Sequence, residues 1–414
     1  MASEPLAEFI KFACVPRDAW HQSGTLERAE SIRAAHPEVA TADIHAAAIL
    51  GDDVTVRRFI EADRASAIHK GGPYGWDALT HLCFSRYLRL DRARSDGFVR
   101  AAESLLDAGA SPNTGFHEGE HQPKPEFESA LYGAAGVAHH PELTRLLLGR
   151  GADPNDGETE YHSPEGFDNR AMEIIVESGK LAKMGLTTML ARKIDWTDYD
   201  GAVWLLEHGA DPNDMSHWGR RSLQHAIGRD STIRFFVLLL DHGADPLLPA
   251  KDGTSTSAIA AAAGRGDVLT LFEQRGFPVV LDGDDAWLGA LSQGDEVRAR
   301  AMVTADPELI ARVRTRYPEL LVSFAGAGNT TGTRILLDLG FDVATPTRHG
   351  ETALHAATWR EREATVELLL ARGAPREARN HRAETPLDVA RRAQVEYSEF
   401  TPHSSPAIVE LLSR

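Results

Sequence analysis

The chain contains 414 residues, of which 42% are hydrophobic and 25% are charged, and its formal net charge at pH 7 is −17. Such an acidic balance disfavours nucleic acid and anionic lipid as partners, because both select surfaces rich in lysine and arginine. No apolar run is long enough to span a bilayer, and the N-terminal sequence lacks the pattern of a secretory signal, so we expect a cytoplasmic protein.

The first 39 residues contain two helical patterns, LAEFIKF and TLERAESIRAAH, which we interpret as an N-terminal helical cap. The segment that begins at Asp43, DIHAAAILGDDVTVRRFIEA, predicts two helices around a Gly-Asp turn. The only two cysteines, Cys14 and Cys83, are too few for a disulfide framework, and we expect both to be small core residues. We expect an insertion near residues 88–98.

The sequence HEGEH, from His117 to His121, has the H-x-x-E-H spacing of some metallopeptidases. That spacing brings two histidines to one face only when it lies on a helix. Because Gly119, Pro123 and Pro125 disfavour a helix here, we interpret the segment as a solvated loop and expect no metal site and no cofactor.

A phrase of the type LL-x-x-G-A-D-P returns along the chain, at Leu105, Leu147, Leu205, Leu239, Leu336 and Leu369. Its leucines fit the buried stripe of a helix, and its glycine fits the left-handed position that ends a helix. Measured between these glycines, the spacing is 34 residues from Gly209 to Gly243, 33 to Gly276, 64 to Gly340 and 33 to Gly373. The repeat period is therefore near 33, with two units in the longest interval.

The clearest unit, GETALHAATWREREATVELLLARGAP, runs from Gly350 to Pro375 and has Thr352 as the expected N-cap of its first helix. Together with the period, it resembles the ankyrin-repeat family, in particular bacterial-type arrays with many irregular repeats. His355 matches the histidine of the family's T-P-L-H pattern, which hydrogen-bonds to the backbone. The resemblance implies an all-α solenoid of stacked helix pairs with β-turn fingers and a concave groove. It covers residues 40–414 as about ten units, irregular at 156–200 and with a second insertion near 394–406.

The irregular region lacks the closing phrase between Gly151 and Gly209, which are 58 residues apart. Its sequence predicts one helix from Asn169 to Ser178 and another that begins at Thr187. Arg192 and Lys193 then fall where the family has small residues facing the groove, and the inter-helix turn is filled by Asp195, Trp196, Asp198 and Tyr199.

We expect the groove to bind through aromatic and charged residues at these and neighbouring positions, because tryptophan, tyrosine and arginine are enriched at interface hot spots. An alternative is that Trp196 or Tyr199 packs into a gap left by the irregular unit. The predicted binding residues are Arg192, Lys193, Trp196, Tyr199, His217, Trp218, Arg220, His225, Arg229, Trp359 and Arg360.

Three functions are open at this point. The first is a non-catalytic adaptor, scaffold or regulator that binds a protein or peptide, with basic segments to match the acidic surface. The second is an enzyme that uses general acid–base catalysis on a peptide or small molecule, through Asp195, Asp198, His162, Glu165 and His217. The third is a structural or assembly role, although polar ends favour a capped monomer.

Overall fold

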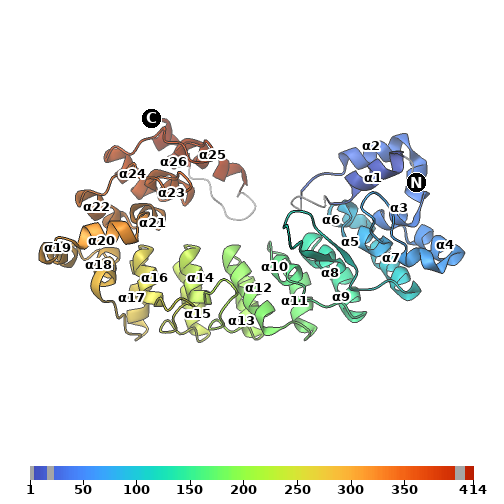
Figure 1. The fold of residues 1–414 in the computed structure, drawn as a ribbon, viewed down its shortest axis with the longest axis horizontal. Helices are drawn as coiled ribbons and strands as arrows, with labels where there is room; N and C mark the ends of the chain where they lie inside the picture. Colours follow the sequence, from blue (N-terminus) through green and yellow to red (C-terminus); the bar gives the residue numbers. More distant parts are fainter. Residues whose placement is uncertain (1–3, 16–22, 397–405) are drawn as a thin grey trace. The chain divides into compact units, whose positions relative to one another are not determined.

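The computed structural model describes residues 4–15, 23–396 and 406–414 (Figure 1), and most of the insertion predicted at 394–406 lies outside them. The chain divides into two compact units. The first comprises Met1–Lys193 and Asp200–Ala210, and the second comprises Ile194–Tyr199 and Asp211–Arg414. The predicted division between a cap and an array at residues 39 and 40 stays a prediction.

The first unit holds the helices up to α13, although the ends of α12 and α13 that face their common turn belong to the second unit. The helices are α1 (Glu4–Ala13), α2 (Glu27–Ala35), η1 (Pro37–Thr41), α3 (Ile44–Ile49), α4 (Asp53–Ala62), η2 (Arg64–Ile68), α5 (Ala78–Cys83), α6 (Arg86–Leu90), η3 (Arg92–Arg94), α7 (Ser95–Ala108), α8 (Ala130–Tyr132), the π-helical η4 (Gly133–Val137), α9 (Pro141–Gly149), α10 (Glu158–His162), α11 (Arg170–Glu177), α12 (Lys183–Asp195) and α13 (Tyr199–Glu207).

The second unit continues the same alternation of a first and a second helix in each pair, with one additional helix, α20. Its helices are α14 (Ser222–Gly228), α15 (Ile233–Asp241), α16 (Thr256–Ala262), α17 (Gly266–Gln274), α18 (Gly283–Ser292), α19 (Glu296–Ala305), α20 (Leu309–Arg316), α21 (Leu320–Gly326), α22 (Thr330–Asp338), α23 (Ala353–Trp359), α24 (Glu363–Ala371), α25 (Pro386–Glu396) and α26 (Pro406–Ser413).

Each unit has two helical layers. First helices contact first helices, as α16 does with α14 and α18, and second helices contact second helices, as α24 does with α22 and α26. The first helices are short and rich in alanine, and the buried alanines of α16, Ala258, Ala260 and Ala261, allow its neighbours to approach closely. The chain is thus an all-α stack of helix pairs, as predicted.

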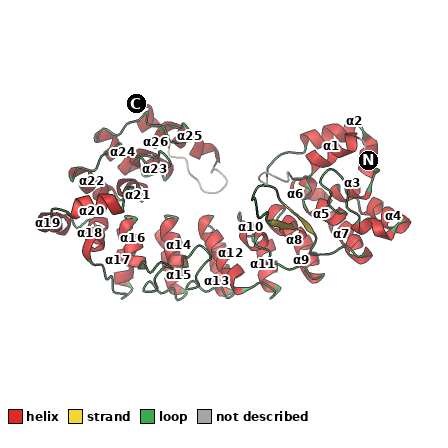
Figure 2. Ribbon diagram, viewed as in Figure 1, coloured by secondary structure: helices red, strands yellow, loops and turns green. Residues whose placement is uncertain are grey.

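One β-hairpin interrupts the helices of the first unit (Figure 2). Its strands, β1 (Gly115–His117) and β2 (Phe127–Ser129), pair antiparallel with Phe116 opposite Glu128. The HEGEH segment, predicted as a loop, therefore begins in a strand at His117 and continues into the hairpin connection.

Where the closing phrase is present, its glycine adopts the left-handed conformation after the second helix, with φ of 99° at Gly209, 85° at Gly243 and 78° at Gly373. This confirms its predicted role in ending the helix. Gly179 takes the same conformation, with φ of 67°, directly after α11 and Ser178. The irregular region is consequently two short units, of 28 residues from Gly151 to Gly179 and 30 residues from Gly179 to Gly209.

The structure corrects three sequence predictions in this region. The helix expected from Thr187 begins four residues earlier, at Lys183. An additional helix, α10, precedes α11. Asp195 and Tyr199 were placed in the inter-helix turn, but Asp195 ends α12 and Tyr199 begins α13.

The turn within eight of the described helix pairs contains a residue with positive φ. It is glycine at Gly51, Gly264, Gly294 and Gly328, but another residue at His139, Thr197, Asp230 and Glu361. Non-glycine residues rarely take this conformation, because the Cβ atom then approaches the backbone. Each of these four non-glycine residues therefore adopts its backbone conformation at an energetic cost.

Successive turns of the second unit are joined by Asn329, the N-cap of α22. Its Oδ1 accepts a hydrogen bond from the backbone N of Gly332 at 2.9 Å. Its Nδ2 donates to the carbonyl oxygens of Gly264 at 2.8 Å and Ser292 at 2.7 Å. One side chain thus caps a helix and holds the turns of two preceding helix pairs.

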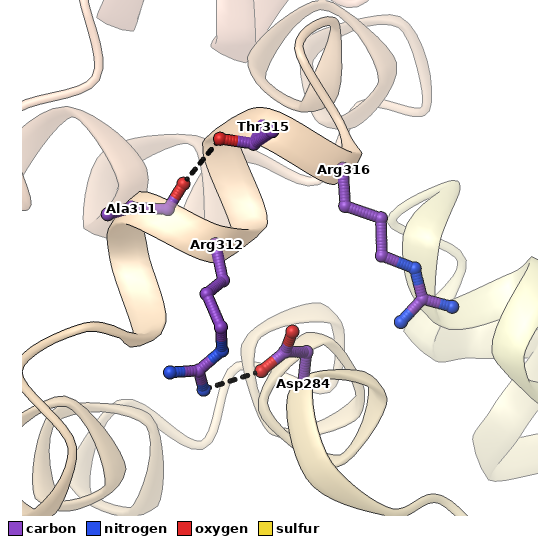
Figure 3. A pocket seen from close by; sticks show the side chains of 5 residues that line it. All are labelled: Asp284, Ala311, Arg312, Thr315 and Arg316. Atoms are coloured by element: carbon purple, nitrogen blue, oxygen red, sulfur yellow. Dashed lines mark hydrogen bonds and ion pairs between the residues drawn. The ribbon is translucent and has the colours of Figure 1, made fainter.

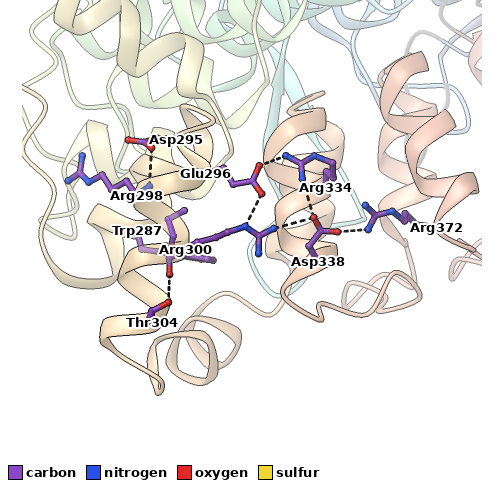
Figure 4. Close-up of polar contacts among 10 residues, drawn as sticks. Trp287, Asp295, Glu296, Arg298, Arg300, Thr304, Arg334, Asp338 and Arg372 are labelled. Atoms are coloured by element: carbon purple, nitrogen blue, oxygen red, sulfur yellow. Dashed lines mark hydrogen bonds and ion pairs between the residues drawn. The ribbon is translucent and has the colours of Figure 1, made fainter.

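An ion-pair network joins the second helices of the same unit (Figure 4). Arg334 and Arg300 both pair with Glu296 and with Asp338, and Arg372 also pairs with Asp338 at 2.8 Å. Hydrogen bonds from Arg334 and Arg300 lower the pKa of Glu296 to about 2. The network therefore keeps the carboxylate of Glu296 charged throughout the neutral range.

Cys14 and Cys83 are both buried, as predicted, and burial raises the pKa of each thiol. Within the described residues, no helix combines the length and the apolar character that crossing a membrane requires.

Candidate functional site

Five of the residues singled out in the sequence form one connected group in the second unit. The carboxylate of Asp195, at the end of α12, lies 2.6 Å from Nε2 of His225 and 2.5 Å from Nε of Arg229. The ring of Trp218, in the finger before α14, lies 3.8 Å from the ring of His217 and 5.9 Å from that of His225, between centroids. We call these five residues the Trp218 patch.

The Trp218 patch has a buried base and an exposed surface. The side chains of Asp195 and His225 are 9% and 11% exposed, whereas Trp218 is 42% exposed and His217 is also exposed. Burial lowers the pKa of His217, so this ring is neutral at pH 7. The buried hydrogen bond to Asp195 fixes the ring of His225, which in turn lies against Trp218.

A second group forms around Asp230, the residue that follows Arg229. Asp230 has φ of 54°, and its buried carboxylate pairs with Arg265 at 3.2 Å, with Arg360 at 3.4 Å and with Arg362. Arg362 also donates from Nε to the carbonyl oxygen of Gly326 at 3.1 Å. We call these four residues the Asp230 cluster.

Trp359 and Arg360, predicted as binding residues, lie at the end of α23 beside this cluster. Both are partly exposed. The guanidinium of Arg392 lies 4.6 Å from the ring centre of Trp359, a cation–π contact, and Arg392 pairs with Glu384 at 2.6 Å. Because Arg229 and Asp230 are consecutive, the Asp230 cluster connects the predicted binding residues around Arg229 with those at Trp359 and Arg360.

Arg192 and Lys193 were predicted to face a groove, and this is wrong. Lys193 is 0% exposed, and its Nζ donates to the carbonyl oxygen of Gly166 at 2.9 Å. Arg192 is 9% exposed, pairs with Glu165 at 2.6 Å and lies 4.1 Å from the ring centre of Tyr161. Both cations are used inside the first unit to bind the segment between α10 and α11.

The remaining predicted binding residues lie outside the two groups. The ring of Tyr199 packs against Phe235 of α15, 5.7 Å away between centroids, and lies 3.8 Å from the guanidinium of Arg234. These contacts are with the following helix pair, so packing into a gap left by the preceding unit stays a prediction. Trp196 is partly exposed, in the turn between α12 and α13. Arg220 is exposed in the finger before α14.

The predicted catalytic residues are divided between the units. His162 and Glu165 belong to the first unit, and Asp195, Asp198 and His217 belong to the second. Nδ1 of His162 lies 3.2 Å from Glu165, and Nε2 lies 3.2 Å from Glu158. Asp198 is 5% exposed.

Both members of the His162–Glu165 pair are charged at neutral pH. Burial by itself lowers the pKa of His162, but Glu158 and Glu165 outweigh burial and raise this pKa to about 9. Burial by itself raises the pKa of Glu165, but His162 and Arg192 outweigh it and leave the pKa below its ordinary value. A pair with such pKa values is a structural ion pair rather than a proton-transfer pair poised near pH 7.

Two pockets among the described residues lie apart from these groups. One, of about 460 Å³, is lined by Ala311, Arg312, Thr315 and Arg316 of α20 and by Asp284, which pairs with Arg312 at 2.9 Å (Figure 3). The other, of about 390 Å³, lies in the first unit and is lined mainly by aromatic rings, including Tyr74, Trp76, Phe116 and Phe127. Over residues 4–15, 23–396 and 406–414, no group of three or more His, Cys, Asp and Glu side chains is arranged to hold a metal ion.

Sequence reasoning did not identify Asp230, Arg265 or Arg362. A signal for Asp230 was present, because this residue stands at the turn position that glycine occupies in four other helix pairs. The partners of Asp230 carried no such signal. Arg362 is 132 residues further along the chain, so its contact depends on how the helix pairs stack.

Comparisons with known proteins agree with the fold. A family model for the ankyrin repeat matches residues 349–381. The human SH3 and multiple ankyrin repeat domains protein 2 is 24% identical over 223 residues, which is 52% of this chain and 12% of that protein. Cyclin-dependent kinase 4 inhibitor B is 40% identical over 83 residues in both the human and the bovine protein, which is 20% of this chain and 58% and 61% of those proteins.

This chain therefore spans less than two thirds of the length of each of these curated relatives. A solved structure, the ankyrin repeat domain of Bcl-3, described as a unique member of the IkappaB protein family, is also similar. It is 16% identical with a TM-score of 0.23, and the match covers 54% of this chain and 97% of that chain.

Proposed function

The chain is an ankyrin-repeat protein, and we propose that it binds a protein or peptide through the Trp218 patch and the adjoining Asp230 cluster. Ankyrin repeats are in general protein–protein interaction modules. The proposed role is that of an adaptor, scaffold or regulator that acts by binding. One relative is named as an inhibitor of a kinase, and a regulator that acts by binding an enzyme falls within this role.

The observation that carries the proposal is the exposed ring of Trp218 between two histidines, one of which is fixed by a buried hydrogen bond to Asp195. Exposed tryptophan beside arginine is typical of binding hot spots, where the ring inserts into a pocket of the partner. The contacts to His217 and His225 restrict the ring before binding, so less side-chain entropy is lost when a partner is bound.

The net charge of −17 further supports a partner that carries basic segments, because charges of opposite sign increase the rate of encounter. Such steering acts at long range and depends on the whole surface. It does not determine which side chains contact the patch itself.

The test is capture of partners on the immobilised full-length chain, with quantitative mass spectrometry of the bound proteins. Trp218→Ala is compared with Phe167→Ala, which removes an aromatic ring that is 51% exposed in the first unit. We expect Trp218→Ala to weaken binding by about 2 kcal/mol, or about thirtyfold in affinity.

Phe167→Ala should leave the affinity of the captured partner unchanged. Because Trp218 is exposed, the thermal unfolding of both variants should match that of the unmodified chain. Partners retained equally by Trp218→Ala and by the unmodified chain would refute the assignment of this patch.

A further inference from the structure

In the Asp230 cluster and at Arg229, buried carboxylates pair with guanidinium groups that reach the surface, except for that of Arg265, which is buried. The side chain of Asp230 is 6% exposed, whereas those of Arg360 and Arg362 are 38% and 35% exposed. Arg229 is 54% exposed above Asp195, which is 9% exposed. The surface therefore presents arginine, although the chain as a whole is acidic.

Other charges near these arginines have their own partners or are partly covered. Arg265 is buried and binds Asp267 through two hydrogen bonds of 2.8 Å, so that the exposed carboxylate of Asp267 is already engaged. Glu361, between the two exposed arginines, is partly buried and occupies the left-handed turn with φ of 56°. Arg229 is exposed, and Arg360 and Arg362 are partly exposed on either side of Glu361, which is partly exposed as well.

These arginines are held before any partner arrives. A guanidinium has five N–H donors, and the ion pairs here occupy one nitrogen of Arg229 and one of Arg360. Asp195 and Asp230 restrict the side chains, which reduces the entropy lost on binding. Guanidinium groups bind carboxylates through two parallel hydrogen bonds, which favours arginine over lysine at such a site.

We propose that Arg229, Arg360 and Arg362 bind an acidic peptide segment of the partner, whose Asp or Glu side chains contact the guanidinium groups while neighbouring side chains contact Trp218 and Trp359. This inference rests on the proposed function and specifies the chemistry of the same site. The acidic net charge of the chain does not oppose it, because charges more than about 8 Å away are largely screened at physiological salt. Basic segments of the partner then lie outside this contact.

The experiment is selection of peptides from a random library displayed on phage, on the immobilised full-length chain at physiological salt. The selected peptides are then titrated in solution against the unmodified chain, Arg229→Gln/Arg360→Gln, Trp218→Ala and the control Arg298→Gln. Arg298 is an exposed arginine of α19, so its replacement makes the same chemical change elsewhere in the second unit. The double variant preserves the ion pairs of Asp230 with Arg265 and Arg362.

We expect the selected peptides to be enriched in Asp and Glu, and the double variant to bind them at least tenfold more weakly. Arg298→Gln should bind them as the unmodified chain does. If the double variant fails to fold, the same loss is expected when Glu and Asp of the selected peptide are replaced by Gln and Asn and the peptide is titrated against the unmodified chain.

Selection of neutral or basic peptides, an affinity unchanged by both sets of replacements, or no selection at all would overturn the inference. Peptides that require Trp218 but carry no acidic residue would overturn it and leave the proposed function standing. Acidic peptides that require the arginines but bind Trp218→Ala normally would support the inference and refute the part of the proposed function that assigns binding to Trp218.

Discussion

Replacing Asn329 by alanine should destabilise the second unit by about 3 kcal/mol. The change removes the N-cap acceptor of α22, which is worth about 1 kcal/mol. It also removes the donors to the carbonyl oxygens of Gly264 and Ser292, both of which belong to buried residues. Each lost bond of this kind costs about 1 kcal/mol.

A matched control separates the cap from the contacts between turns. Asp295 is the N-cap of α19 and accepts one hydrogen bond, from the backbone N of Arg298 at 3.0 Å. Asp295→Ala should therefore cost only about 1 kcal/mol. The difference of about 2 kcal/mol between the two variants is the expected contribution of the two bonds to preceding turns.

The free energy of unfolding is measured by urea denaturation followed by circular dichroism. Because a repeat protein need not unfold in one step, amide hydrogen exchange is measured as well, on peptides from α16, α18 and α22. Asn329→Ala should increase exchange in all three helices. An equal loss of stability in Asn329→Ala and Asp295→Ala, with increased exchange confined to α22, would refute the role of Asn329 in joining the turns.

Two further predictions concern pH and the first unit. The pKa of His162 is raised to about 9, so the stability that its ion pairs contribute should be fully present below pH 6.5 and lost as pH rises through 9. The expected loss is on the order of 3 kcal/mol. His162→Gln should abolish this loss, as measured by urea denaturation at a series of pH values. Burial and, after it, the charge of Glu158 raise the pKa of Glu128 to about 8, so ionisation disfavours the fold as pH rises from 4.5 through 8. Glu128→Gln should stabilise the first unit by a few kcal/mol at pH 8 and have little effect at pH 4, and equal effects at both pH values would contradict this reasoning.

Much of the fold was predictable because successive helix pairs repeat the same local sequence features. The closing glycine ends the second helix, and His355 accepts a hydrogen bond from the backbone N of Thr352 at 3.1 Å while its Nε2 bonds to the carbonyl oxygen of Glu384 at the same distance. The glycine and the bond to Thr352 depend on nearby residues and are therefore visible in the sequence, whereas the bond to Glu384 reaches the next unit. Gly179 shows how a small departure, IIVESG in place of LL-x-x-G, concealed a unit of normal construction.

The orientation of long side chains was less predictable. Arg192 and Lys193 occupy positions where the family has small residues, and the sequence alone favoured exposure. In the structure, the short α10 and the segment that follows it bring Glu165 and the carbonyl oxygen of Gly166 to these cations. A buried cation requires such partners, and partners supplied by an irregular loop leave no periodic pattern.

The turn residues indicate where this chain departs from its own repeat for a reason other than folding. Glycine would adopt the left-handed conformation at position 230 without strain, whereas aspartate there costs on the order of 1 kcal/mol. That cost is offset by ion pairs from Arg265, Arg360 and Arg362, two of which remain at the surface. Glycine with apolar neighbours would fold at least as well, since replacing buried ion pairs by apolar packing is often neutral or stabilising. Stability alone therefore does not account for aspartate and three arginines at this turn, whereas the proposed binding role of the guanidinium groups would account for them.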